Sequence, residues 1–427
     1  MLAFIHLSDI HFNKSSGDPY DIDQDLRDEL LYDISRCYDN IIRKIDGILI
    51  CGDIAFSGKK EEYSIATSFL DEIFKKVPLE KDRVFCVPGN HDVDRSIAKS
   101  GMSVRCLHHA LKSAATVTNF DSCLGRIFRN KMDAEALYSP IACYNEEFAA
   151  KYSCKSTQDR PNWEQDIMLH GNYTLRLIGI NSTIVSSEED SLPGGREEPM
   201  RISRMQIPSR KENAIYLSLC HHPPECWFDP ENILKQRMNH RVALQLYGHK
   251  HLQTIKREGN SLIVGCGAAN PVREDADWVP RYNWITLDVS ENKGVPALIV
   301  KIYPRILDKD EDRFEADRMS CEGQEFIEFL IDLVDQDAEL ARLEKTQQEK
   351  ESKVFVDSWE RRFAYDFMNL PYYKREVILQ KLNLKYPEDD GMKHTELLKI
   401  IIHRAEAKEC VDELLAEITR AKGQCEL

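Results

Sequence analysis

Five short apolar runs in this sequence each end in aspartate, asparagine or histidine, and this pattern constrains the fold more than any other feature. The runs are FIHLSDIH with Asp9 and His11, ILICGD with Asp53, VFCVPGNHD with Asn90, His91 and Asp92, YLSLCHH with His221 and His222, and LQLYGHKH with His249 and His251. Apolar runs of this length predict buried strands. In open α/β sheets, sites form beyond the carboxyl ends of strands. We therefore expect the five polar ends to converge on one site.

The rest of the first 300 residues alternates apolar runs with helical patterns. Residues 21–45 place their leucines and isoleucines on one helical face. Further strands are expected at 47–51, 84–87, 173–180, 215–220, 242–247, 261–264 and 284–289. Strands that alternate with helices predict a layered α/β fold.

Composition changes along the chain predict three parts. Residues 1–318 form the α/β domain, and residues 93–170 form a helical cap inserted into it, because this insert is longer than a connection needs. Gln324 to Leu370 contains neither glycine nor proline, so a long helical connector is expected over 319–357. Amphipathic helices then resume and predict a small all-α bundle over 358–427.

The polar ends have the chemistry of a two-metal centre. Divalent cations bind carboxylate oxygens and neutral imidazoles, and a carboxylate can bridge two ions about 3.5–4 Å apart. Asp9 and His11 are two residues apart, as are His249 and His251, so on a strand each pair would point to one face. Glycines at 52, 89 and 248 would let the backbone turn sharply beside these ligands.

The ordered set D-x-H (9–11), G-D (52–53), G-N-H-D (89–92), H (221) and G-H-x-H (248–251) resembles the calcineurin-like metallophosphoesterase family over about residues 1–305. The resemblance implies a four-layer α-β-β-α sandwich that hydrolyses phosphoesters. It also implies two divalent ions, of which manganese is preferred and iron, zinc or nickel are compatible with the same ligands. Position by position, the first ion would be held by Asp9, His11, Asp53 and His251, and the second by Asp53, Asn90, His221 and His249.

The same resemblance implies catalytic roles for two more residues. His91 would donate a proton to the leaving oxygen, and Asp92 would orient His91. His221 and His222 remain alternatives for one metal position. The spacing in LCHHPP favours His221 as the ligand, which leaves His222 to face the substrate.

The charge of the cap favours an anionic substrate. Between Arg95 and Lys131, seven basic residues and one acidic residue, Asp121, give a net charge of +6, whereas the whole chain carries −15. A basic surface beside a phosphoesterase centre is suited to nucleic acid or a nucleotide. Arg95, Arg126 and Arg129 are therefore expected to bind substrate. We expect a phosphodiesterase, either a nuclease or an enzyme for nucleotides, and a cyclic-nucleotide phosphodiesterase remains an alternative.

Residues 358–427 resemble, through a pattern of helices around Leu370-Pro371-Tyr372, the death-like effector-associated domains of bacterial conflict and signalling proteins. This resemblance implies a protein partner, recruitment of the enzyme and a role in antiphage defence. An ordinary helical dimerisation tail would show a similar pattern, so an oligomer is also compatible. The alternative from another class is a signalling adaptor whose phosphoesterase fold is only a binding platform.

The compartment is predicted from what the sequence lacks. No apolar run of 18 residues exists, the N-terminus does not have the pattern of a signal peptide, and thirteen cysteines include no CxxC pair. We expect a cytoplasmic protein with reduced thiols and no membrane partner.

Overall fold

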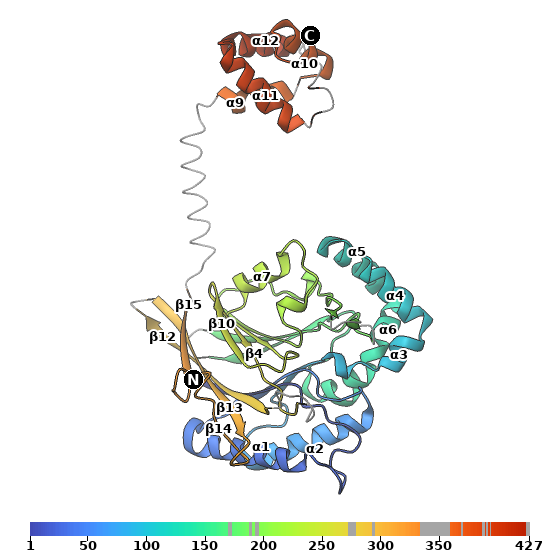
Figure 1. Cartoon of the computed structure of the whole chain (residues 1–427), viewed down its shortest axis with the longest axis vertical. Coiled ribbons are helices and arrows are strands. Elements are labelled where there is room, and N and C mark those ends of the chain that lie inside the picture. The colour runs from blue at the N-terminus through green and yellow to red at the C-terminus, as the bar shows by residue number, and fades with distance from the viewer. Residues whose placement is uncertain are drawn as a thin grey trace. The chain divides into compact units, whose positions relative to one another are not determined.

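The computed structural model describes residues 1–169, 173–187, 190–192, 196–271, 279–292, 295–333, 359–368, 370–386, 389, 392 and 394–423. The chain divides into two compact units, Met1–Val334 and Asp335–Leu427 (Figure 1). Within the described residues, no helix is long and apolar enough to cross a membrane. The twelve described cysteines are free thiols.

Two mixed sheets form the centre of the first unit. The first sheet has the order β14 (Arg313–Ala316), β13 (Val295–Asp308), β12 (Arg281–Asn292), β1 (Leu2–Leu7), β2 (Gly47–Cys51) and β3 (Val84–Val87), and β15 (Ile327–Asp332) pairs with β13. The second sheet has the order β10 (Thr254–Glu258), β11 (Ser261–Gly265), β9 (Leu244–Tyr247), β8 (Ala214–Cys220), β5 (Thr174–Ile180) and β4 (Asn162–Met168). A separate two-stranded sheet joins β6 (Ser191–Leu192) and β7 (Arg196–Glu197).

Within each sheet, the strands that carry the polar ends run parallel to one another. β1, β2 and β3 are parallel in the first sheet, and β5, β8 and β9 are parallel in the second. Strands that are buried on both faces tend to be continuously apolar, and β2 and β3 are buried at every position. This arrangement brings the carboxyl ends of the parallel strands to one edge of each sheet.

The two sheets pack face to face with helices outside them. One apolar core joins side chains of both sheets, such as Leu49 and Leu217, to α1 (Gln24–Cys37) and α2 (Lys60–Lys76). A second core packs α7 (Ile233–Arg241) against the outer face of the second sheet. These layers confirm the predicted α/β sandwich.

The cap is helical over most of its length. It contains α3 (Arg95–Ser100), α4 (Met102–Lys112), α5 (Val117–Phe128) and α6 (Lys131–Tyr138), followed by short 3₁₀ and π turns to Tyr152. The predicted cap boundary at residue 170 is wrong, because residues 162–168 form β4 at the edge of the second sheet. The alternating pattern of half-buried side chains in NWEQDIM explains this edge position.

The helical connector predicted for 319–357 is wrong at its start. Residues 327–332 form β15, which pairs with Ala297–Ile302 of β13. A short apolar run does not distinguish a helix from a strand by periodicity, and here the available edge of β13 supplies backbone partners. Residues 334–357 lie outside the described residues.

The second unit contains four described helices, α9 (Trp359–Met368), α10 (Tyr372–Lys381), α11 (His394–Ala407) and α12 (Val411–Gly423). Their apolar faces share one core that includes Phe363, Phe367, Ile401, Leu414 and Ile418. The fold therefore contains the expected all-α segment near the C-terminal end of the sequence.

Candidate metal centre

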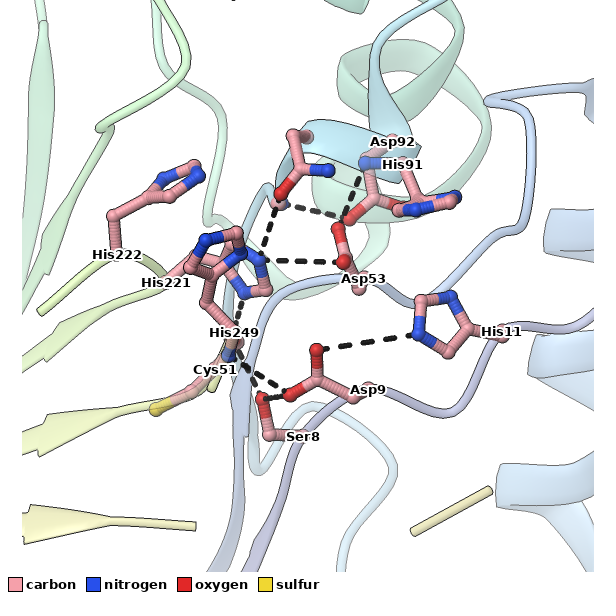
Figure 2. A network of polar contacts seen from close by, with 12 residues as sticks. Ser8, Asp9, His11, Cys51, Asp53, His91, Asp92, His221, His222 and His249 are labelled. Carbon is pink, nitrogen blue, oxygen red and sulfur yellow. Dashed lines mark hydrogen bonds and ion pairs between the residues drawn. The ribbon is translucent and has the colours of Figure 1, made fainter. Parts of the chain in front are cut away.

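The polar ends of the five apolar runs meet where the strands end (Figure 2). Asp9 and Asp53 follow β1 and β2, Asn90 follows β3, and His221 and His249 follow β8 and β9. Four overlapping groups of side chains each have ligand atoms within 4.8 Å of one another: Asp9, His11 and His251; His11, Asp53 and His91; Asp9, Asp53 and His221; and His221, His222 and His249. Ligands from both sheets are thus brought to one place.

The backbone at this centre is strained. Asp9, His11, Asp53, His249 and His251 all have left-handed φ angles, between 51° and 69°. Such conformations cost about 1–3 kcal/mol each for ordinary residues and persist where surrounding structure enforces them. The expectation that each pair projects from a strand is therefore wrong. The strands end at Leu7 and Tyr247, and left-handed turns aim the side chains instead.

Two glycines allow the loops to approach one another. Gly52 has a φ of +83°, which favours glycine, and an added Cβ would lie 2.7 Å from His221 Nδ1. Gly89 lies against the Asp53 carboxylate, where an added Cβ would lie 2.1 Å from Asp53 Oδ1. The sequence analysis expected a sharp backbone turn at Gly89. The structure shows instead that glycine is needed there because a side chain would collide with Asp53.

Asp53 lies at the middle of the centre. Its Oδ2 is 3.3 Å from His221 Nε2, and its Oδ1 accepts a 2.8 Å hydrogen bond from the backbone N–H of His91. His221 Nδ1 donates to the Cys51 carbonyl at 2.7 Å, so Nε2 faces Asp53 and, at 3.1 Å, Asn90 Oδ1. A histidine held through one nitrogen by a carbonyl presents the other nitrogen in the way that metal-ligating histidines do.

Asp9 is held so that one oxygen is left for a ligand. Its Oδ2 accepts hydrogen bonds from Ser8 Oγ at 2.5 Å and from the backbone N–H of His249 at 3.1 Å. Its buried Oδ1 makes no hydrogen bond, and it faces His251 Nε2 at 3.2 Å and His11 Nε2 at 4.0 Å. A fully buried carboxylate oxygen that makes no hydrogen bond is costly unless a cation satisfies it.

The electrostatics of the centre also suit a cation. Burial raises the pKa of Asp53, but the charge and hydrogen bond of His221, together with the charges of His11 and His91, bring that pKa well below its ordinary value. Burial lowers the pKa of His221, but the Asp53 carboxylate overrides it and raises the pKa to about 9. Burial lowers the pKa of His11 to about 4, which keeps this imidazole neutral. Two buried carboxylates thus share a small space with imidazoles.

His91 and Asp92 have different environments. His91 Nδ1 donates to the Phe56 carbonyl at 2.8 Å, and the ring lies 4.7 Å from that of His11. The Asp92 carboxylate instead accepts hydrogen bonds from three backbone N–H groups, those of residues 54, 55 and 89, and from the Tyr63 hydroxyl. Asp92 therefore joins the loops that carry Asp53 and Asn90, and the Phe56 carbonyl performs the orienting role that the sequence analysis gave to Asp92.

Comparison with known proteins gives the family. A sequence model described as calcineurin-like phosphoesterase matches residues 2–253. The chain belongs to this family. It is also similar to an uncharacterised metallophosphoesterase-like protein, YydB, of Bacillus subtilis strain 168, with 22% identity over 317 residues, which cover 71% of this chain and 60% of YydB. The chain thus spans less than two thirds of that relative.

Solved structures with a similar fold include a single-mutant form of Vps29 of Entamoeba histolytica, with 12% identity, 77% of this chain and 99% of that chain covered, and a TM-score of 0.32. Another is GAP50 of Plasmodium, which has 11% identity and a TM-score of 0.35. The match covers 78% of this chain and 88% of GAP50.

The residues of this phosphoesterase unit fit divalent metal ions. Carboxylate, amide and imidazole ligands surround Asp53, and several of their polar atoms have no hydrogen-bond partner. The family typically uses divalent metals, and this donor set is the chemistry that such ions require.

The structure places both histidines of the LCHHPP segment in the centre. His221 contacts Asp53 and Asn90. His222 is fully buried, its Nδ1 is 2.7 Å from Ser182 Oγ, and its ring centroid is 4.4 Å from that of His249. Sequence reasoning missed Ser8, Phe56 and Ser182, because their roles depend on contacts between segments far apart in the chain.

The arginines expected to bind substrate lie on the cap. Arg95 begins α3, and Arg126 and Arg129 lie at the end of α5, where all three are exposed. Within the described residues, no hydrogen bond or ion pair joins them to the metal-binding side chains. Lys112 is one of the seven basic residues counted in the cap, and its charge is already paired with Glu198 at 2.5 Å.

Proposed function

We propose that this phosphoesterase is a two-metal phosphodiesterase that acts on nucleic acid or nucleotides. The observation that supports this proposal most strongly is the convergence of Asp, Asn and His side chains from both sheets around the Asp53 carboxylate. Asp53 is 2% exposed, its Oδ2 faces the His221 ring, and its Oδ1 accepts a hydrogen bond from the backbone N–H of His91. A carboxylate in this position can bridge two cations.

The side chains divide into two half-sites that share Asp53. The first contains Asp9, His11 and His251, and Asp9 Oδ1 is its buried oxygen that makes no hydrogen bond. The second contains Asn90, His221 and His249. When bound, the two cations would supply a nucleophilic hydroxide and neutralise charge on the phosphoryl group. Manganese is the first choice of metal for the centre, and iron, zinc and nickel accept the same ligand types.

His91 is suited to hold a proton for the leaving oxygen. Because its Nδ1 donates to the Phe56 carbonyl, Nε2 is the nitrogen left to pass a proton to the leaving oxygen. The ring is partly exposed beside His11, so Nε2 can reach a substrate while the ring orientation stays fixed. General acid catalysis of this kind contributes about 10²–10⁴-fold.

The cap and Phe56 favour a substrate with several phosphates or a base. Arg95, Arg126 and Arg129 are exposed cations on a segment that begins directly after the Asn90–Asp92 turn. Phe56 is 48% exposed, and its ring lies 5.4 Å from that of His91. An exposed aromatic ring beside the proton donor offers a stacking surface for a base.

The helical unit would serve as a recruitment device. Its four described helices bury an apolar core of their own, so they offer a surface that is separate from the chemistry. A binding unit on the same chain raises the effective concentration of the enzyme near its partner. A protein partner and a role in antiphage defence remain predictions from the sequence resemblance.

A substrate panel tests the proposal. The full chain, loaded with Mn²⁺, is assayed on single-stranded DNA, duplex DNA, RNA, cyclic nucleotides, bis-p-nitrophenyl phosphate and p-nitrophenyl phosphate, with His91→Ala as the control. We expect hydrolysis of diesters over monoesters, and loss of about 10²-fold or more in the control. Hydrolysis of monoesters alone, or rates that are equal in the control, would contradict the proposal.

A further inference from the structure

His222 is the fully buried histidine of the centre whose role the family pattern leaves open. It follows β8, and three contacts fix it: its backbone N–H donates to Ser182 Oγ at 3.4 Å, its carbonyl accepts from Trp227 Nε1 at 2.8 Å, and its Nδ1 lies 2.7 Å from Ser182 Oγ. The ring therefore has one orientation. Its other nitrogen, Nε2, is buried and has no hydrogen-bond partner.

The environment of this free nitrogen is the second half-site. The His222 ring centroid is 4.4 Å from that of His249 and 4.7 Å from that of His221. One nitrogen from each of the three rings lies within 4.8 Å of the others. Since Ser182 engages Nδ1, Nε2 is the nitrogen of His222 that remains for a ligand. A buried polar atom without a partner is costly, so the unpartnered Nε2 favours a ligand at this place.

We propose that His222 Nε2 is a ligand of the second cation. This inference rests on the proposed two-cation centre. The second half-site would then offer three imidazoles, from residues 221, 222 and 249, together with the Asp53 carboxylate and the Asn90 amide. The first half-site offers two imidazoles, from His11 and His251, with the carboxylates of Asp9 and Asp53. The two positions thus differ in nitrogen content.

This difference has a consequence for metal preference. Imidazole-rich sites favour zinc, iron, cobalt and nickel, whereas carboxylate-rich sites suit manganese and magnesium. The second position would therefore select a nitrogen-preferring cation, and the first would accept a harder one. The centre would be asymmetric, with two different metals when both kinds are present.

Metal binding by the full-length protein tests this inference. Metal-free protein is titrated with Zn²⁺ and, separately, with Mn²⁺ in competition with a chelator, which gives a dissociation constant for each of two equivalents. His222→Leu should weaken one zinc equivalent by about tenfold or more and leave the other unchanged, while the manganese constants change by about threefold or less. Ser182→Ala should weaken the same zinc equivalent by a smaller factor.

A matched control is His108→Leu. His108 is also a buried histidine with an unpartnered Nε2, but it lies in α4 of the cap. The dissociation constants of His108→Leu for zinc and manganese should equal those of the unmodified protein. Unchanged zinc constants in His222→Leu would overturn the inference. Weaker inhibition of the same variant by inorganic phosphate would then make His222 a substrate contact.

A second measurement needs no substitution and covers the case in which His222→Leu fails to fold. In zinc-loaded protein with ¹⁵N-labelled histidine, the metal-bound ring nitrogens are counted by NMR. Five such nitrogens, from residues 11, 221, 222, 249 and 251, support the inference, and four overturn it. If the unmodified protein binds fewer than two cations, the two-metal proposal itself fails. This result differs from a count of four or five metal-bound nitrogens, so the two failures can be told apart.

Discussion

The metal centre and the cap both belong to the first unit, but they differ in how closely their residues follow ordinary backbone and hydrogen-bonding preferences. At the centre, five of the metal-binding candidates have positive φ angles, and Asp9 Oδ1 is buried without a hydrogen bond. In the cap, which the structure describes in full between residues 95 and 138, no non-glycine residue has a positive φ. Asp94, Thr116 and Asn130 cap their helices with side-chain hydrogen bonds to backbone N–H groups.

This contrast separates function from stability. A region that violates local preferences needs compensation from elsewhere, and such violations concentrate at functional sites. The cap follows local preferences, so its sequence mainly specifies its own helices and their packing. Changes at the centre should therefore alter chemistry strongly, and changes in the cap should alter stability or substrate preference by smaller amounts.

Asp53→Asn should have the largest effect. The amide keeps the shape of the side chain but removes the negative charge that both half-sites share, and it leaves His221 beside a neutral group. We expect the bound metal to fall below two equivalents and phosphodiester hydrolysis to fall by about 10³-fold or more, which corresponds to about 4 kcal/mol. Elemental analysis of dialysed protein together with rates on bis-p-nitrophenyl phosphate gives both values. Full metal occupancy with normal rates would remove the distinction between centre and cap.

Asp92→Asn tests whether Asp92 is an anchor rather than a catalytic group. The carboxylate accepts hydrogen bonds from three backbone N–H groups and from Tyr63, so an amide would turn an N–H₂ toward donors. Burial and the charge of Asp53 raise the pKa of Asp92 to about 7, and loss of that repulsion offsets part of the damage. We expect the first unit to lose about 2 kcal/mol of unfolding free energy, measured by urea denaturation.

Tyr63→Phe is the control for that prediction, since it removes one of the four hydrogen bonds and should cost about 1 kcal/mol. If Asp92→Asn left stability unchanged while the rate collapsed, Asp92 would act in the chemistry and the orienting role first inferred from the sequence would return.

The comparison also explains what the sequence could predict. The residues of the centre were predictable for two reasons. Asp9, Asp53 and Asn90 each lie two or three residues after a buried apolar run, and parallel strands bring such ends together. The way in which they are aimed was not predictable. Alternation along a strand suggested that Asp9 and His11 share a face, whereas both lie beyond β1 in left-handed turns.

Contacts between distant segments were equally hidden. Ser182 holds His222 across 40 positions of sequence, and the Phe56 carbonyl holds His91 across 35. Among the strands that the sequence analysis did not predict, β4 and β15 lie at sheet edges, where side chains are half-exposed and periodicity is weak. The inserted cap segment was correctly predicted to be helical, because its helices have capping side chains and a continuous apolar face.

His108→Gln measures the cost of one buried group in the cap. Burial, followed by the charge of Lys112, lowers the pKa of His108 from 6.5 to about 4. Between these values the unfolded chain binds a proton that the folded chain does not, so His108 makes stability fall as pH falls from about 7 to 4. The loss is about 2 kcal/mol at pH 5. Thermal unfolding at pH 7.5 and pH 5 should show a smaller pH effect in His108→Gln.

The neighbouring His109 provides the matched control, because it is exposed on the same helix. His109→Gln should keep the full pH effect of the unmodified protein. Equal pH effects in both variants would mean that His108 is not held neutral by burial.

Arg126→Ala with Arg129→Ala should have the smallest effect on chemistry, and this double variant tests whether the cap contributes to substrate binding. Each arginine that contacts a phosphate adds about 0.7–0.9 to the slope of log affinity against log salt. We expect cleavage of single-stranded DNA at low substrate concentration to fall by about tenfold, with a shallower salt dependence, while bis-p-nitrophenyl phosphate is hydrolysed at the normal rate. Arg313→Ala, which removes an exposed arginine from β14, should leave the hydrolysis rates of both substrates unchanged. Equal losses on the polymer and the small diester would show that the cap arginines act on the centre itself, and the cap could no longer be described as separate from the chemistry.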